Sequence, residues 1–282
     1  MSRRKKVALV IGSGSVKCAA ALGLQRVLER EGIPIDLVVG CSGGSLYAAT
    51  IALGWPAEKA IDVTLKLWTR ELTRRHRRRA YLQILFPKLF HFDETFGMVD
   101  DRLIMSRLRQ LFGETTFAGA AIPFFVTATD LYTGEQAIFS EGSLVDAMRA
   151  SMAIPYIFPP YKIGDRYYLD GYMSDPLPVG VAIREGADVI IAMGFDSPHQ
   201  TRISSLFRYA LQVSSITSNN LLQSNFAFHN LAHYSEILPI IPEFKERIGL
   251  FDTGKLPAIV ETGERAALEQ LPYLRELLES EA

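Results

Sequence analysis

A Gly-x-Ser-x-Gly pentapeptide stands between a strand-like run and a helix-like run, and this setting constrains the fold more than any other feature of the chain. The pentapeptide runs from Gly40 to Gly44, with strand-like residues 35–39 before it and the apolar, Ala-rich residues 46–53 after it. Glycines remove the Cβ clashes that a sharp strand-to-helix turn would otherwise create. The pattern predicts an α/β fold in which Ser42 is a candidate nucleophile and Gly40 and Gly44 shape the turn.

Apolar strand-like runs alternate with helical runs along the chain, as in α/β proteins. Strands are expected at residues 7–11, 35–39, 124–128, 189–193 and 237–241, and helices at 19–30, after Ser42, and at 144–151. The unbroken apolarity of several strand-like runs is typical of strands covered on both faces. This order predicts a three-layer sandwich with a mainly parallel central sheet.

The chain is long enough for one full-size core, since it has 282 residues of which 48% are hydrophobic. No repeat, low-complexity tract or linker divides it, so we expect residues 1–282 to form a single domain. Strand-like runs lapse at about 57–111, which predicts a helical insertion and a candidate lid. A helical C-terminal extension is expected at about 204–282.

Bulk charge gives no reason to expect nucleic-acid binding, because 30 Lys+Arg residues face 31 Asp+Glu residues. The basic residues 1–6 precede an apolar run that is too short for a secretory signal, and no apolar run reaches the ~18 residues that cross a bilayer. Cys18 and Cys41 match no disulfide framework or metal-ligand spacing. These features predict a cytoplasmic protein that binds no metal.

A second turn of small residues, residues 12–17, lies between the first expected strand and the first expected helix. Backbone N–H groups that converge there can bind a phosphate or stabilise the oxyanion of an acyl intermediate. A dinucleotide-binding fingerprint would need glycine at position 17, where Lys17 stands, and an acidic residue after the second strand, where Gly40 and Cys41 stand. We therefore expect no nucleotide cofactor.

A β-hairpin is expected from Tyr161 to Leu169, with its turn at Gly164 and Asp165. Asp170 and Gly171 follow its second strand directly. An Asp-Gly pair is by default a turn that caps the end of a strand. The hairpin can also aim the Asp170 carboxylate, which makes Asp170 a candidate base for Ser42.

The order of these elements resembles the patatin-like phospholipase family. The resemblance consists of a glycine-rich turn with a basic residue, the Gly-x-Ser-x-Gly turn, and an Asp-Gly pair after a hairpin. It spans residues 7–196 approximately, and the segments 128–135 and 149–155 look like those of bacterial members. The resemblance implies a patatin-like fold and a lipid acyl ester, such as a phospholipid, as substrate.

The resemblance also implies a Ser-Asp dyad that needs no histidine. Ser42 would attack an ester carbonyl, Asp170 would take its proton, and water would hydrolyse the acyl-enzyme. Gly14 and Ser15 would offer backbone amides to the oxyanion, with Lys17 where the family usually carries arginine. The chain is thus predicted to be a carboxylic ester hydrolase.

Three departures from the family pattern surround this predicted site. Ser13 and Ser15 interrupt the run of glycines, Cys18 stands where a glycine usually follows the basic residue, and Tyr172 replaces a small residue after Asp170 and Gly171. Serine keeps its N–H, so the oxyanion donors survive if the turn needs no positive φ there. A second hypothesis is therefore a catalytically silent lipid-binding or regulatory protein on the same fold.

A Ser-His-Asp hydrolase is a third hypothesis, because histidines follow Asp170 in the chain order that an α/β-hydrolase uses. The candidate histidines are His199, His229 and His233. The other acidic candidates are Asp130, Asp175 and Asp196. Isolated histidines on helices or near strand ends are usually ordinary surface or core residues, which favours the dyad over the triad.

A basic run from Arg74 to Arg79 leads into an apolar run from Ile84 to Phe90. Such a pairing suits peripheral contact with an anionic lipid surface, here the inner face of the membrane. It suits equally a solvated arginine face on a helix that packs against the domain. Aromatic and aliphatic residues that can line an acyl channel, or belong to the core, are Phe86, Tyr156, Ile157 and Phe158.

Overall fold

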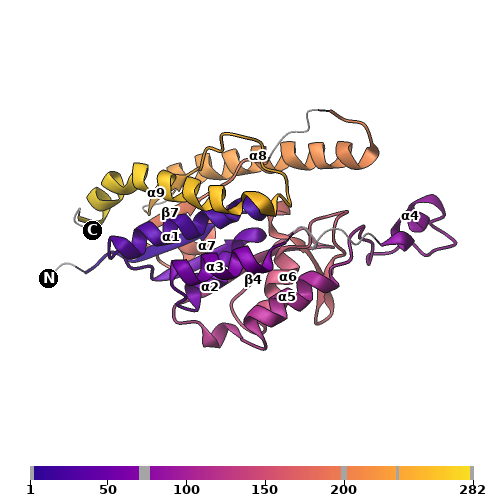
Figure 1. Cartoon of the computed structure of the whole chain (residues 1–282), viewed down its shortest axis with the longest axis horizontal. Coiled ribbons are helices and arrows are strands. Elements are labelled where there is room, and N and C mark those ends of the chain that lie inside the picture. The colour runs from indigo at the N-terminus through magenta and orange to yellow at the C-terminus, as the bar shows by residue number, and fades with distance from the viewer. Residues whose placement is uncertain (1–2, 70–76, 198–201, 233–234, 280–282) are drawn as a thin grey trace.

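The computed structural model describes residues 3–69, 77–197, 202–232 and 235–279 (Figure 1). The strands are β1 Val7–Ile11, β2 Leu37–Cys41, β3 Phe124–Asp130, β4 Gln136–Phe139, β5 Tyr161–Ile163, β6 Arg166–Asp170, β7 Val189–Met193 and β8 Glu236–Ile240. The α-helices are α1 Ala20–Arg30, α2 Gly43–Ala52, α3 Ala57–Leu67, α4 Arg78–Leu85, α5 Arg102–Phe112, α6 Leu144–Ser151, α7 Val179–Arg184, α8 Leu206–Ala232 and α9 Leu256–Glu279. Short 3-10 helices are η1 Ser15–Ala19, η3 Phe117–Gly119, η4 Gly171–Met173 and η5 Thr253–Lys255.

The strands form one mixed sheet in the order β5-β6-β3-β2-β1-β7-β8, with β4 also paired to β3. Pairing is parallel from β3 through β2, β1 and β7 to β8, and antiparallel at β3–β4, β3–β6 and β5–β6. The predicted mainly parallel sheet is confirmed. In the register, Ile11 at the end of β1 pairs with Gly40 of β2 and with Met193 of β7. The turns that follow β1 and β2 therefore leave the sheet side by side.

Helices cover both faces of the sheet, because successive side chains of a strand point to opposite faces. In β1, Val7, Leu9 and Ile11 pack with α1, α2 and α9 on one face, whereas Ala8 and Val10 pack with α7 and part of α8 on the other. All five residues of β1 are buried. The predicted three-layer α/β fold is confirmed.

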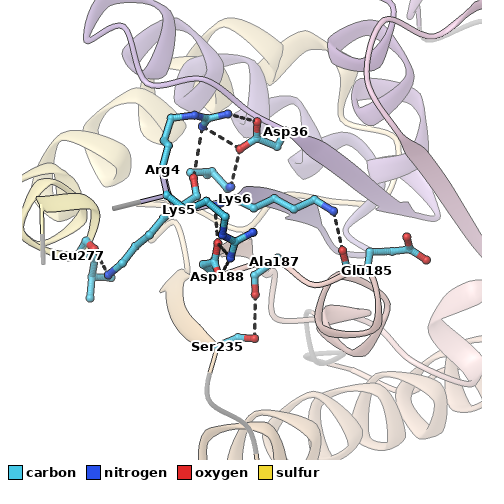
Figure 2. Close-up of polar contacts among 11 residues, drawn as sticks. Arg4, Lys5, Lys6, Asp36, Glu185, Ala187, Asp188, Ser235 and Leu277 are labelled. Atoms are coloured by element: carbon cyan, nitrogen blue, oxygen red, sulfur yellow. Dashed lines mark hydrogen bonds and ion pairs between the residues drawn. The ribbon is translucent and has the colours of Figure 1, made fainter. Parts of the chain in front are cut away.

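The basic residues before β1 fasten the amino end of the sheet (Figure 2). The N–H of Val7 donates to Asp36 over 2.7 Å and the N–H of Lys6 donates to Asp188 over 2.6 Å. Arg4 forms an ion pair with the same Asp36, and the Lys5 ammonium donates to the carbonyl of Leu277 over 2.7 Å. These cations therefore anchor the first strand at the end of the sheet opposite to the Ser42 turn.

Helices α3, α4 and α5 occupy the region where the sequence predicts a helical insertion. Helix α4 lies on an arm that extends away from the body of the molecule, whereas α5 packs against α6 (Figure 1). Among the described residues, no helix combines the length and the apolarity that a membrane crossing requires.

The sequence analysis misplaced the bounds of β2 and missed β4. Strand β2 covers Leu37–Cys41 and not residues 35–39, because Gly40 and Cys41 continue the pairing with Val126 and Thr127. Strand β4, Gln136–Phe139, was not predicted at all. It lies beside β3 with mostly half-buried side chains, so it carries neither a buried run nor a clear alternation.

Candidate active site

Ser42 lies in a sharp turn between β2 and α2, with φ of 54° and ψ of −130°. A positive φ is rarely adopted by residues with a side chain and costs about 1–2 kcal/mol. Glycines surround Ser42 because neighbouring backbone comes too close for a Cβ atom: one on Gly40 would lie 2.5 Å from the Ser45 Cα, and one on Gly44 would lie 2.4 Å from the Ile11 carbonyl oxygen. The sequence thus folds here into the strand-turn-helix geometry of a nucleophile elbow.

The Ser42 hydroxyl donates a hydrogen bond to Asp170 Oδ2 over 2.7 Å. Both side chains are buried, and Asp170 is 0% exposed. Burial raises the pKa of Asp170 to about 7, and the hydrogen bonds from Ser42 and from the Tyr172 N–H oppose this rise. The pair is therefore a serine beside a carboxyl group that titrates near neutral pH.

The sheet register explains why two residues so far apart in the chain meet. Asp170 ends β6, where it pairs with Ala128 of β3, and the adjacent Thr127 pairs with Cys41 at the end of β2. A Cβ on Gly171 would lie 2.5 Å from the Thr127 carbonyl oxygen. Glycine after Asp170 thus allows the chain to cross β3 closely as it leaves the hairpin.

Ser151 holds the backbone of the Ser42 turn, a role that the sequence analysis missed. The N–H of Ser42 donates to Ser151 Oγ over 2.7 Å, and the Ser151 hydroxyl donates to the Thr127 carbonyl over 2.6 Å. Ser151 is 0% exposed and ends α6. Its place in the family-like segment 149–155 was the one available signal for this role.

The small-residue turn after β1 lies directly against the elbow, since a Cβ on Gly43 would meet the Ser15 carbonyl oxygen at 2.6 Å. The N–H of Ser13 is used by the Pro176 carbonyl at 2.8 Å. The N–H groups of Gly14 and Ser15 have no hydrogen-bond acceptor among the described residues. They are therefore available as oxyanion donors beside Ser42.

The altered turn fails the condition that the sequence analysis set, because its backbone demands a positive φ at Ser15. Ser15 has φ of 52°, and its hydroxyl donates a hydrogen bond to the Leu250 carbonyl. Gly14 has an extended φ of −176°, and what requires glycine there is the ring of Phe195, which lies 2.7 Å from a Cβ built at this position. Serine therefore occupies a position whose backbone favours glycine.

Lys17 is buried and does not face Ser42 with a free ammonium group. Its Nζ donates to the Asp196 carbonyl and lies 5.9 Å from the centroid of the Phe244 ring. Burial lowers the pKa of Lys17. The lysine therefore braces the loop through a single carbonyl, where an arginine would offer several donors.

Two clefts meet at Ser42. One has about 770 Å³ of unfilled space and is mainly apolar; its walls include Val16, Leu46, Tyr47, Met152, Phe158 and Phe251. The other has about 700 Å³ and is rich in hydroxyl groups; its walls include Ser13, Tyr172, Ser197, Ser214 and Ser215. Ser15, Ser42 and Ile154 line both clefts.

Of the predicted channel residues, Phe158 lines the apolar cleft. Ile157, Tyr156 and Phe86 are not among the lining residues of this cleft. Ile157 is buried, whereas Tyr156 and Phe86 are more than half exposed. Ile157 is therefore a core residue, and Tyr156 and Phe86 are surface residues. The acyl-channel prediction is thus limited to one of its four residues.

Two of the other acidic candidates act in turns. Asp130 accepts hydrogen bonds from the N–H groups of Tyr132 and Thr133, and Asp175 accepts from the N–H of Leu177. For Asp196, the backbone carbonyl is the group that contacts Lys17. Within the described ranges, no three or more His, Cys, Asp and Glu side chains cluster in an arrangement that could hold a metal ion.

Some predicted residues lie outside the part of the chain that the structure describes. They are His199, His233, Arg74 and Arg75, together with the side chains of His229, Arg78 and Arg79. Their predicted roles stay predictions. Arg77 is described, and its guanidinium donates to the Thr95 carbonyl over 3.1 Å.

Comparison with solved structures shows the same fold in VipD from Legionella pneumophila. The superposition has a TM-score of 0.50 at 14% sequence identity and covers 99% of this chain and 67% of VipD. An identity this low speaks to the fold alone. It agrees with the mainly parallel, helix-covered sheet described above.

Comparison of sequences finds relatives named for neuropathy target esterase (NTE). An uncharacterized NTE family protein of Mycobacterium tuberculosis is 30% identical over 195 residues, which is 69% of this chain and 50% of that protein. Neuropathy target esterase sws of Drosophila melanogaster is 30% identical over 208 residues, 71% of this chain and 13% of that protein. The chain therefore spans half or less of the length of these relatives.

A model of the patatin-like phospholipase family matches residues 9–183, more than half of the chain, and these residues contain both the Ser42 turn and Asp170. The chain belongs to the patatin-like phospholipase family.

Proposed function

We propose that this chain is a serine acyl hydrolase that cleaves lipid esters, with Ser42 as nucleophile and Asp170 as base. The observation that supports this most is the 2.7 Å hydrogen bond from the Ser42 hydroxyl to Asp170, at a point where two clefts meet. The family of the chain supplies the substrate class, a phospholipid or another fatty-acyl ester. The position of the pair in the fold, its chemistry and the family of the chain all support this proposal.

The proposed reaction begins when Ser42 Oγ attacks the ester carbonyl carbon and its proton passes to Asp170 Oδ2. The oxyanion of the tetrahedral intermediate would accept hydrogen bonds from the N–H groups of Gly14 and Ser15. Collapse breaks the bond to the alcohol, which leaves with the proton held by Asp170, and an ester on Ser42 remains. Water then attacks this ester while Asp170 takes its proton, and collapse releases the fatty acid and returns that proton to Ser42.

The position of Asp170 suits the work of a base at neutral pH. A carboxylate with an ordinary pKa is too weak a base to take a serine proton readily, and burial corrects this by raising the pKa of Asp170 to about 7. Its second oxygen accepts the Tyr172 N–H at 3.1 Å, so the carboxylate is held in one orientation. The N-terminus of α2 directly after Ser42 adds a positive dipole end beside the developing negative charge.

The two clefts suggest which half of the ester lies where. An acyl chain gains most from the apolar cleft, where Leu46, Met152 and Phe158 exclude water. The alcohol half suits the hydroxyl-rich cleft, whose lining includes Ser13, Ser197 and Ser215. Ser42 stands at the junction, which is where the bond between the two halves has to lie.

A catalytically silent lipid-binding protein is the second candidate, and Ser15 is the observation that favours it. The oxyanion turn holds a serine at φ of 52° where the family usually has glycine. Both N–H groups remain without an acceptor among the described residues, which favours the enzyme. The two functions differ in whether Ser42 reacts.

A fluorophosphonate probe separates the two candidates. We expect covalent labelling and release of fatty acid from lipid esters by the wild-type chain, and neither by Ser42→Ala. Asp170→Asn should abolish turnover, whereas His199→Ala, which removes one candidate histidine of a triad, should retain most of it. A folded wild-type chain that never labels and never hydrolyses an ester would establish the silent function instead.

A further inference from the structure

Two protruding elements of the fold expose apolar side chains that nothing in the described chain covers. One is the arm that carries α4, and the other is the N-terminal half of α8 (Figure 1). Single exposed apolar residues are ordinary on a protein surface, but groups of them mark interaction sites. Both groups therefore need a partner.

The α4 arm is held together from within, so its exposed side chains are not the result of an unpacked segment. Ala80 and Gln83 are buried, and the Gln83 amide donates to the His91 carbonyl over 3.0 Å. At the tip, by contrast, Leu85 is 68% exposed, Phe86 54% and Leu89 72%. The arm thus presents an apolar tip on a frame with its own contacts.

The N-terminal half of α8 carries an apolar stripe that points away from the domain. Tyr209, Val213 and Ile216 are all more than two-fifths exposed, and their spacing of four and three residues places them on one face of the helix. Leu211 and Ser214 lie on the opposite face and line the hydroxyl-rich cleft. The stripe is therefore the outer side of a cleft wall.

Both elements adjoin the clefts that meet at Ser42. Trp68 and Thr69, the last described residues before the arm, line the apolar cleft. The arm returns at Val99, whose N–H donates to the Ile157 carbonyl over 2.9 Å, one residue before Phe158 of the same cleft. The arm and α8 extend from the same side of the molecule (Figure 1). The two apolar groups thus flank the way into the site.

We propose that the tip of the α4 arm and the outer stripe of α8 together form a docking surface for a phospholipid bilayer. Leucine and phenylalanine side chains at the tip insert between lipids, and the tyrosine of α8 lies at the level of the head groups. The clefts then open toward the membrane, so an acyl ester can pass to Ser42 without crossing water. The docking surface itself does not depend on whether Ser42 is a nucleophile.

Charge and shape favour a bilayer over a protein partner or a second copy of the chain. Exposed cations accompany both elements: Lys88 on the arm, and Arg202 and Arg208 beside the start of α8. Cations next to inserting apolar residues gain energy from anionic head groups. Asp93 and Glu94, the exposed acids of the arm, follow Phe92 and lie beyond the tip in sequence. Two separate protrusions also suit a broad, deformable surface better than one rigid groove.

Vesicle flotation in a Ser42→Ala background tests the proposal without hydrolysis of the lipid. The probe is vesicles of phosphatidylcholine with phosphatidylglycerol. The triple variant Leu85→Gln/Phe86→Gln/Leu89→Gln should lower the partition onto vesicles at least about tenfold, since loss of one fully inserted side chain already has an effect of this size. The matched control Leu268→Gln/Tyr273→Gln alters two exposed apolar residues of α9 and should leave the partition unchanged.

A polarity-sensitive fluorophore tests insertion directly. The native thiols of Cys18 and Cys41 are buried, so a thiol-reactive label will attach selectively to Leu89→Cys or to the control Leu268→Cys. Vesicles should shift the emission of the label at position 89 to the blue and leave the label at position 268 unchanged. Lipids with a quencher in the acyl region should quench only the former.

Several results would overturn the proposal. They are the absence of vesicle binding by the Ser42→Ala parent, equal binding by the triple variant, and an unshifted label at position 89. A dimer that the triple variant converts to a monomer, with vesicle binding unchanged, would assign the surface to a second copy. Hydrolysis of a water-soluble short-chain ester by the triple variant with Ser42 intact tests the proposed function separately, because that substrate needs no membrane.

Discussion

The backbone N–H of Ser42 donates a hydrogen bond to the hydroxyl oxygen of Ser151, a residue 109 positions later in the chain. The Ser151 hydroxyl in turn donates to the Thr127 carbonyl of β3. The end of β2, the end of α6 and the middle of β3 are thus joined at one side chain. Because Ser42 holds a positive φ, its backbone needs such support from the surrounding structure.

Replacing Ser151 with alanine should lower kcat more than it changes KM. The variant loses both hydrogen bonds and leaves a buried N–H and a buried carbonyl without partners, at a cost of about 1–3 kcal/mol each. The Ser42 turn is then free to relax, so we expect kcat on a soluble ester to fall by about tenfold to a hundredfold. Steady-state kinetics and thermal unfolding measure the two effects.

Ser143→Ala is the matched control at the other end of α6. The Ser143 hydroxyl caps the helix by accepting the Asp146 N–H at 3.2 Å and touches no part of the site. Its removal should cost about 1 kcal/mol of stability and leave kcat unchanged. Equal losses of kcat in Ser143→Ala and Ser151→Ala would show that Ser151 acts only through the stability of α6.

The activity should depend on pH through the ionisation of Asp170, whose pKa is raised to about 7 by burial. In the proposed reaction Asp170 takes a proton in its deprotonated form, so kcat/KM should be constant above pH 8 and fall about tenfold for each pH unit below about 6. The profile should show one ascending limb with a midpoint near 7. A midpoint near 4 would mean that Asp170 is not the base or is not buried in the active form.

Asp170→Asn should stabilise the fold, and more so at high pH. The folded pKa of Asp170 is about 7 against an ordinary value of 3.8. Between these values the folded chain holds a proton that the unfolded chain has released, so the free energy of unfolding falls as pH rises. Asparagine stays neutral at every pH. The free energy of unfolding of Asp170→Asn relative to that of wild type should therefore grow by a few kcal/mol over this window. The loss of one hydrogen bond subtracts about 1 kcal/mol from this gain. Denaturant unfolding at pH 5 and pH 8 measures the difference, and an equal effect at both would contradict the burial argument.

The sequence predicts the centre of this fold well because its strands are uniformly apolar. The bounds of β1, α6 and β7 agree with the predicted ranges 7–11, 144–151 and 189–193. Strand β4 escaped prediction because an edge strand with half-buried side chains is stabilised by its pairing to β3 and not by a pattern of its own. Long-range pairing is what a local pattern does not contain.

At the candidate site, too, the residues that a local pattern marks could be predicted, and those whose role depends on long-range contacts could not. Ser42 and Asp170 could be found because glycines mark them, and each glycine is there for a close backbone approach that the structure shows. Ser151 carries no such mark, since a serine at the end of a helix is common and its role exists only between two distant backbone groups. The positive φ of Ser15 was hidden for the opposite reason, because serine is not the residue that this backbone favours.

Substitutions at Ser15 should show whether the altered turn is weakened in its proposed role as oxyanion donor. Ser15→Gly removes a strain of about 1 kcal/mol and loses a hydrogen bond of similar value to the Leu250 carbonyl, so stability should change little. Ser15→Ala loses the hydrogen bond and keeps the strain, so it should be less stable than Ser15→Gly by about 1–2 kcal/mol. Both keep the N–H, so kcat should stay within about threefold of wild type. An increase of kcat by tenfold or more in Ser15→Gly would show instead that the serine impairs the oxyanion turn.

Gly44→Ala should destroy the site by steric overlap. The new Cβ would lie 2.4 Å from the Ile11 carbonyl oxygen and 2.6 Å from that of Gly12, both backbone atoms, and Ile11 ends a central strand. Neither can yield, so α2 and Ser42 must shift, and we expect more than about 3 kcal/mol of destabilisation with loss of fluorophosphonate labelling. Gly134→Ala is the control, because Gly134 has φ of 73° and nothing lies within 4 Å of a Cβ built there. This change should cost only about 1 kcal/mol of stability, the cost of a side chain at positive φ, and labelling should persist. If Gly44→Ala folded, labelled and unfolded like Gly134→Ala, the close packing of the elbow on β1 would not be needed to hold Ser42 in place.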